Sequence, residues 1–272
     1  MVLALTAALA WGGSDFTGGL ASRRSSPLEV LALSRISVLV LLAAAAAGTR
    51  DPLPTLTAAA WAAGAGLSGA LGLGVLYRGL ATERSALVVP TAGVVGAAIP
   101  VLFGAVVEGV LPLLQQAGMV MALVGIWLVS GPHRANQTAV RGPVIGAVAG
   151  IGFGGFFILL GQIESGAVFT PLIAAGGAGL VAAVIALVHT GAKLPAPTRN
   201  PTALWAGAMD AAGIVCYALA VRWIRLDVAA VLGSLYPAIT VLLFRAVLKE
   251  RAAPTQWLGL VVCVFAIALI VV

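Results

Sequence analysis

The feature that most constrains this chain is a succession of ten apolar segments, each close to the length of a membrane span and separated by short connectors. A helix rises about 1.5 Å per residue and the bilayer core is about 30 Å thick, so one span takes roughly 20 apolar residues. With 61% hydrophobic and only 9% charged residues, the composition excludes an ordinary water-soluble fold. We therefore predict an all-α, multi-pass protein of the plasma membrane. The predicted spans cover residues 2–21, 29–47, 57–77, 86–106, 113–131, 143–162, 168–189, 203–221, 228–247 and 255–272.

The chain repeats itself at a shift of about 142 residues. This shift places Trp11-Gly12-Gly13 over Phe153-Gly154-Gly155, and residues 86–108 over residues 228–250 without a gap. We predict two five-helix repeats, residues 1–131 and 143–272. Because five is odd, the second copy enters the membrane from the opposite face, which is the inverted-topology repeat of secondary transporters.

The basic residues predict an orientation. Of the 15 Lys and Arg residues, 11 lie at connectors on one face and three on the other, and Arg35 lies inside a span. By the positive-inside rule, the richer face is cytoplasmic and both termini lie outside. No basic run with interleaved aromatic residues is present, so we expect no nucleic-acid partner.

Several short motifs resemble the EamA-type family of the drug/metabolite transporter superfamily. They are Ala10-Trp11-Gly12-Gly13, Pro237, Leu248-Lys249-Glu250-Arg251, Gln256 and Gly259. The resemblance implies two EamA-like halves of five helices and the transport of amino acids, drugs, nucleotide sugars or other metabolites. It also implies cytoplasmic termini, contrary to the charge count, so the orientation stays open.

Three charged residues stand out deep inside the predicted spans: Asp15, Arg35 and Asp210. A charge at mid-membrane costs about 2.5 to 3.5 kcal/mol on insertion scales, so such residues are candidates for function. All three lie about seven residues from the same face, roughly 10 Å deep. If they share a cavity, Arg35 neutralises one carboxylate and leaves the other to titrate or bind a cation. Alternatively, Asp15 and Arg35 form a structural pair between adjacent helices, while Asp210 hydrogen-bonds across a helix interface or faces water near the membrane boundary.

Aromatic and small residues add further candidates. Trp11, Tyr217 and Tyr236 lie deep in their spans, where they either stack on a ligand or serve as structural residues. Spaced glycines such as Gly150 and Gly154 predict close helix packing. Glu108 is interpreted as a structural cap or interfacial pair, as are Gln115, Gln116 and Gln256.

The favoured function is secondary transport of a small organic solute, such as a metabolite, amino acid or drug, by alternating access. The proton is the candidate coupling ion, and the protein is expected to be a monomer or homodimer. The alternative is a flippase or scramblase for lipids or lipid-linked carriers. No nucleotide-binding loop, metal-ligand cluster or nucleophile with its base is present, so we expect no cofactor, metal or enzymatic activity.

Overall fold

A computed structural model describes residues 1–82, 88–130, 141–164, 166–192, 196–249 and 253–271. All regular structure in these ranges is helical. The helices are α1 (Val2–Ser22), α2 (Pro27–Thr49), α3 (Leu56–Thr82), α4 (Val88–Val107), α5 (Leu113–Ser130), α6 (Arg141–Gly161), α7 (Phe169–His189), η1 (Pro197–Arg199), α8 (Pro201–Ala220), α9 (Leu226–Gly233), α10 (Tyr236–Leu248) and α11 (Pro254–Val271).

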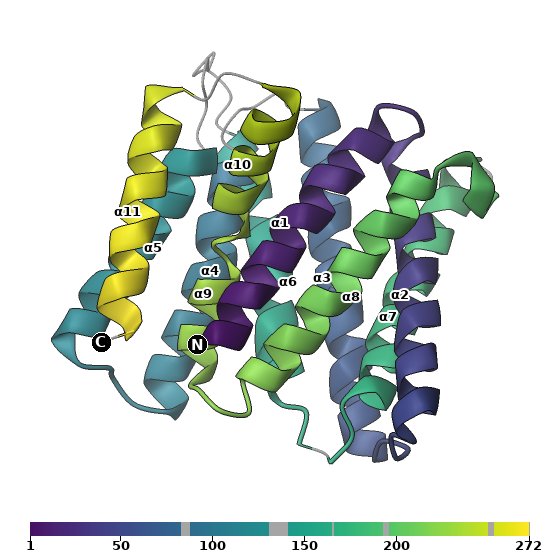
Figure 1. The fold of residues 1–272 in the computed structure, drawn as a ribbon, viewed down its shortest axis with the longest axis horizontal. Coiled ribbons are helices and arrows are strands. Elements are labelled where there is room, and N and C mark those ends of the chain that lie inside the picture. Colours follow the sequence, from purple (N-terminus) through teal and green to yellow (C-terminus); the bar gives the residue numbers. More distant parts are fainter. Residues whose placement is uncertain (83–87, 131–140, 165, 193–195, 250–252, 272) are drawn as a thin grey trace.

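The long helices cross one common layer in alternating directions (Figure 1). Both termini lie at the lower end in this view, which we call the terminal face; the opposite end, to which α1, α3, α5, α7 and α10 lead, is the basic face. Within the described ranges, nine segments are long and apolar enough to cross a membrane, with α9 and α10 together counted as one. The prediction of an all-helical, multi-pass membrane protein is confirmed.

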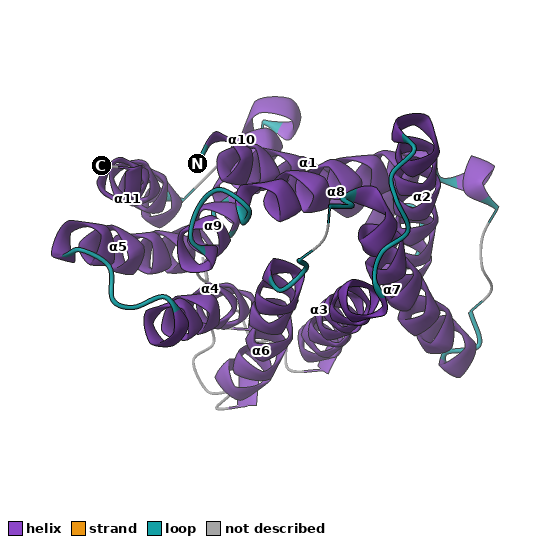
Figure 2. Cartoon of the chain, turned by 90° about the horizontal axis from the view of Figure 1, so that it is seen from below, coloured by secondary structure: helices purple, strands orange, loops and turns teal. Residues whose placement is uncertain are grey.

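Helix α1 is not among those nine segments, although its 21 residues match them in length. Its second half contains Ser14, Asp15 and Thr17, which lower its mean hydropathy. It packs against α8, α9 and α10, and Figure 2 shows it between α8 and α10 on one side of the bundle. The most polar span therefore supplies a wall of the bundle interior.

The ninth predicted span, residues 228–247, is confirmed as a membrane segment, Leu226–Leu248, but it is not one continuous helix. The structure divides it into α9 and α10 at Ser234 and Leu235. Pro237 is the second residue of α10, where a missing N–H and a fixed φ suit a helix start but not a helix interior. All eight residues of α9 are buried, so the break lies inside the protein.

The helix contacts form matched pairs. The α1–α8 packing is matched by α6–α3, the α2–α8 packing by α7–α3, and the packing of α1 on α9 and α10 by that of α6 on α4. The contacts α2–α7, α5–α11 and α4–α9 join elements at corresponding places in the two halves, whereas the α4–α5 packing has only a small counterpart in α10–α11. The inverted repeat stays a prediction, and this pattern supports it.

Glycines permit the closest of these contacts, as their spacing predicts. Gly146, Gly150 and Gly154 follow one another at four-residue intervals along α6 and face α4. A Cβ at Gly146 would lie 2.5 Å from the carbonyl oxygen of Val88, so only glycine fits this approach. The glycines of α6 thus lie against backbone carbonyls of α4 and also make room for the side chains of Val95 and Ile99.

Two glycines of α3 offer a matched test of this packing. A Cβ at Gly66 would overlap the backbone carbonyl of Ala175 in α7, whereas a Cβ at Gly74 would meet nothing within 4 Å. We expect Gly66→Ala to destabilise the protein by about 1 to 3 kcal/mol because the helices must move apart. Gly74→Ala should be neutral. Thermal unfolding in detergent measures both, and equal midpoints would contradict the assigned α3–α7 contact.

Candidate functional site

An ion pair joins two of the three predicted membrane charges. Arg35 Nη2 of α2 lies 2.6 Å from Asp210 Oδ2 of α8, and the two side chains are 23% and 12% exposed. The aliphatic part of Arg35 packs over Gly179 of α7, where the glycine leaves room for it. Arg35 Nε is buried and has no hydrogen-bond partner among the described residues. The pair is therefore largely withdrawn from solvent, with one donor free.

Asp210 Oδ2 also lacks a hydrogen bond of good geometry in the described structure, despite its short contact with Arg35. The contact is thus an ion pair that is not aligned as a hydrogen bond. Asp210 itself is 9% exposed. A charge buried to this extent is stable only when paired, and Arg35 supplies the opposite charge.

Asp15 lies on the face of α1 that points into the bundle. Positions 4, 8, 11 and 15 follow one another at three- and four-residue intervals and so share one side of the helix. Exposure on this side is 0% at Ala4, 3% at Ala8 and 8% at Trp11, but Asp15 is exposed. This side of α1 is therefore buried from its start to Trp11 and exposed at Asp15.

Asp15 has no ion pair or hydrogen bond within the described residues. Next to it, Ser14 donates its hydroxyl to the carbonyl of Ala206, one turn before Asp210, at 2.9 Å. Gly12, one turn before Asp15, lies against the carbonyl of Tyr236. The structure thus brings Asp15 near α8 and the start of α10. Arg35 pairs with Asp210, so the alternative of a structural pair between Asp15 and Arg35 does not match this geometry.

Trp11 and Tyr217 belong to a buried aromatic cluster with Phe156 and Phe157. The Trp11 ring centroid lies 5.6 Å from that of Phe157 and 5.8 Å from that of Tyr217. Tyr217 is fully buried, and its hydroxyl donates to the Phe157 carbonyl at 3.2 Å. The cluster fills the interior on the terminal side of Asp15, so Trp11 and Tyr217 close this part of the bundle, whereas Tyr236 is only half-buried.

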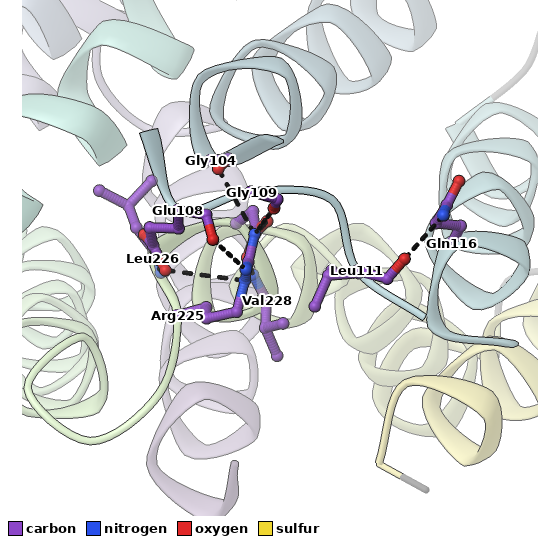
Figure 3. Close-up of polar contacts among 9 residues, drawn as sticks. Gly104, Glu108, Gly109, Leu111, Gln116, Arg225, Leu226 and Val228 are labelled. Carbon is purple, nitrogen blue, oxygen red and sulfur yellow. Dashed lines mark hydrogen bonds and ion pairs between the residues drawn. The ribbon is translucent and has the colours of Figure 1, made fainter. Parts of the chain in front are cut away.

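A network around Arg225 closes the terminal face (Figure 3). Arg225, the N-cap residue of α9, lies 2.8 Å from Asp227 Oδ2 and donates to the carbonyls of Glu108 at 2.9 Å and Gly109 at 2.6 Å. Glu108 Oε1 accepts from the Leu226 amide at 3.3 Å. This network ties the end of α4 to the beginning of α9.

The interpretation of Glu108 as an interfacial pair agrees with this geometry, but Arg225 and Asp227 were not expected as functional residues. Asp227 is 1% exposed and lies against Gly104, whose missing Cβ makes room for the carboxylate. The only signal in the sequence is an arginine two residues before an aspartate at a span end, which is common in solvated turns. Glu250, which corresponds to Glu108 in the repeat, lies outside the described residues.

A second tie on the terminal face comes from Asp51, which lies in the connector between α2 and α3. Its carboxylate accepts the amides of Val168, Phe169 and Thr170 at the start of α7, the last at 2.8 Å. Burial alone would raise the pKa of Asp51, but these amide donors outweigh it and hold the pKa below its ordinary value. The carboxylate also suits the positive end of the helix dipole.

The described residues contain no group of three or more His, Cys, Asp or Glu side chains that could hold a metal ion. The site is instead a membrane interior with one paired and one unpaired carboxylate. Such a site can bind and release a charged or polar ligand, and no covalent chemistry is indicated by its geometry.

Known proteins share features of this sequence and fold. The model of the EamA-like transporter family matches residues 141–272. No curated protein matches the chain. Among 28 matching chains of solved structures, one described as a crystal structure of a protein aligns with a TM-score of 0.75 at 18% identity. That alignment covers 98% of this chain and 94% of the other, so the fold is shared beyond the half that the family model matches.

The Asp51 tie predicts a pH-dependent stability. Because its folded-state pKa is lowered, Asp51 contributes stability above its unfolded pKa of about 3.9, and this contribution is lost as the pH falls through the folded pKa. Asp51→Asn should lower the unfolding temperature at pH 7, and the difference from the unchanged protein should shrink below about pH 4. Thermal scans from neutral to acid pH test this. Glu164→Gln, which removes an exposed carboxylate from the connector between α6 and α7, is the control; a pH-independent effect of Asp51→Asn would contradict the prediction.

Proposed function

Because residues 141–272 match the EamA-like transporter family of the drug/metabolite transporter superfamily, we propose that this chain is a secondary transporter of a small organic solute. Transport proceeds by alternating access, with the two five-helix halves, residues 1–131 and 143–272, moving around a central site. The proposed site comprises Asp15, Arg35, Asp210 and Tyr236, with Trp11 and Tyr217 beneath it.

The observation that carries this proposal is the change of exposure along the inner side of α1. Ala4, Ala8 and Trp11 are buried, whereas Asp15 on the same side is exposed. A channel would be accessible from both ends, and a structural bundle would be buried throughout. Burial at one end of the inner side of α1 and exposure at mid-membrane support a state that is open to one face, as alternating access requires.

Opening of the terminal face requires two separations. The aromatic rings of α1, α6 and α8 must move apart, and Arg225 must leave either Asp227 or the end of α4. The short helix α9 bears Asp227, and the break at Ser234 and Leu235 joins α9 to α10. This break is the hinge we propose, since irregular backbone in a span is tolerated where it lines a cavity.

The proton is the proposed coupling ion, with Asp15 as its acceptor. The charged and titratable groups around Asp15 are Asp210 with its partner Arg35, and Tyr236. Arg35 is engaged by Asp210, so Asp15 is the carboxylate left to exchange a proton for solute. Asp210 keeps the charge of Arg35 neutralised also when Asp15 is protonated.

The alternative of a lipid or lipid-linked carrier flippase finds less support. A groove of about 470 Å³ lies between α3 and α6 at the outer surface, but it is lined by Leu56, Thr57, Ala60, Trp61, Gly64 and Leu159. A path for a lipid headgroup needs polar lining, and Thr57 alone provides it here. The polar residues lie inside the bundle, where a soluble solute can reach them from the basic face.

One-sided access is tested by labelling engineered cysteines. In a background with Cys216 and Cys263 replaced by Ala, Gly18→Cys should react with an impermeant maleimide applied to the basic face, and Ala8→Cys should react from neither face. Adding Arg225→Gln should raise labelling of Ala8→Cys from the terminal face at least fivefold. Removal of one partner from a buried pair costs about 3 to 5 kcal/mol and here weakens the closed state. Arg50→Gln, which removes an exposed arginine from the same face, is the control; equal labelling in both backgrounds would contradict the closure role of Arg225.

The coupling role is tested in proteoliposomes that contain a proton gradient. Asp15→Asn should abolish gradient-driven solute movement without loss of folded protein, and Asp15→Glu should retain part of it. Asp210→Asn should also abolish transport, because it leaves Arg35 unpaired. Unchanged transport and pH dependence in both Asn variants would remove these residues from the mechanism.

A further inference from the structure

The charges of the membrane interior do not balance. Arg35 and Asp210 cancel as an ion pair, which leaves the carboxylate of Asp15 without a positive partner in the described residues. The network at the terminal face has the same sign, because Arg225 is shared between two carboxylates, Glu108 and Asp227. With all carboxyl groups ionised, each of these two groups of charged residues has one more negative than positive charge.

A ligand with a positive charge complements this arrangement. The exposed Asp15 side chain can hydrogen-bond to it, while the unpartnered Arg35 Nε is buried and its guanidinium is held by Asp210. An anionic solute would have to displace Asp210 from Arg35 and would also meet the charge of Asp15. Both the competition with Asp210 for Arg35 and the repulsion by Asp15 therefore weaken the binding of an anion.

The surroundings of Asp15 favour an organic cation over a metal ion. No three acidic, histidine or cysteine side chains gather within the described residues, whereas calcium and magnesium need about six oxygen ligands. Instead, the indole of Trp11 lies one turn away on the same side of α1, and Tyr236 lies at the adjoining start of α10. Aromatic faces attract ammonium groups and accommodate apolar bodies.

We propose that the solute is an organic monocation, with its ammonium group bound by Asp15 and its apolar or aromatic body against Trp11 and Tyr236. This inference rests on the proposed transport function and specifies the substrate class of the same site. Asp210 has no direct role in it: Asp210 is a positioning residue that holds Arg35 away from Asp15, so that the Asp15 carboxylate stays available.

Three small molecules of similar shape and different charge test the proposal by binding to the purified protein. They are 2-phenylethylammonium, the neutral 2-phenylethanol and the anionic 3-phenylpropanoate, with benzyltrimethylammonium as a second cation. We expect the cations to bind at least tenfold more tightly than the neutral and anionic compounds. Asp15→Asn should weaken cation binding at least tenfold, and Asp15→Glu should largely preserve it.

Two controls separate charge recognition from damage to the fold. Asp51→Asn makes the same substitution in a connector far from α1 and should leave cation binding unchanged. Each variant is compared by its unfolding temperature and its elution as a single species. Binding of the neutral compound as tight as that of the cations, tighter binding of the anion, or no Asp15-dependent cation binding would overturn the proposal.

Counterflow of the same compounds in proteoliposomes tests the substrate class separately from the transport function. Movement of the anion or the neutral compound in preference to the cations would overturn the substrate class and leave the transport function standing. Movement of none of them, together with equal labelling of Gly18→Cys and Ala8→Cys, would remove both. Cation movement that is lost in Asp15→Asn supports both.

Discussion

The ion pair between Arg35 and Asp210 is the interaction on which the chemistry of this interior depends. A lone arginine between α2, α7 and α8 would have to be solvated by water drawn into the bundle, at a substantial cost in the membrane. Asp210 removes that need at 2.6 Å, and Gly179 provides the space for the guanidinium stem. With Arg35 engaged by Asp210, Asp15 is the carboxylate that has no ion pair within the described residues.

The paired charges lie among helices that are packed as closely as their backbones allow. Glycines let α6 approach α4 and let α3 approach α7, so parts of these helices lie with backbone against backbone. Lipid gives helices no hydrophobic reason to associate, and such close contact is one of the forces that replaces it. Rigid walls on one side make it natural for motion to occur at α9 and α10, where the span is already broken.

The two ends of the interior differ in how their residues pack. At the terminal face, the aromatic cluster and the Arg225 network act together, one by filling space and the other by joining the ends of α4 and α9. Toward the basic face, Asp15 is exposed and Tyr236 is half-buried. The inner side of α1 is therefore buried near the terminal face and exposed at the depth of Asp15.

Much of the architecture could be predicted from the sequence, because the signals for it are local. Runs of about twenty apolar residues define the spans, and the observed helix ends agree with the predicted ones within a few residues, as in α7 (Phe169–His189) against 168–189. The depth of Asp15, Arg35 and Asp210 follows from the helix rise alone. The break at Ser234 was missed because hydropathy is continuous across it and only Pro237 points to it.

The sequence by itself determined that this is an all-helical, multi-pass membrane protein and that three charges lie at one level of the membrane, while the five-plus-five pattern stays a prediction. Only the tertiary structure decided that Arg35 pairs with Asp210, that Trp11 and Tyr217 lie in the closed aromatic cluster, and that Arg225 joins α9 to α4. The reason is that apolar segments in lipid look alike from every side, so hydropathy cannot reveal which helix faces meet. Those contacts join residues as far apart in the sequence as Trp11 and Tyr217, and they depend on backbone approach that no local pattern records.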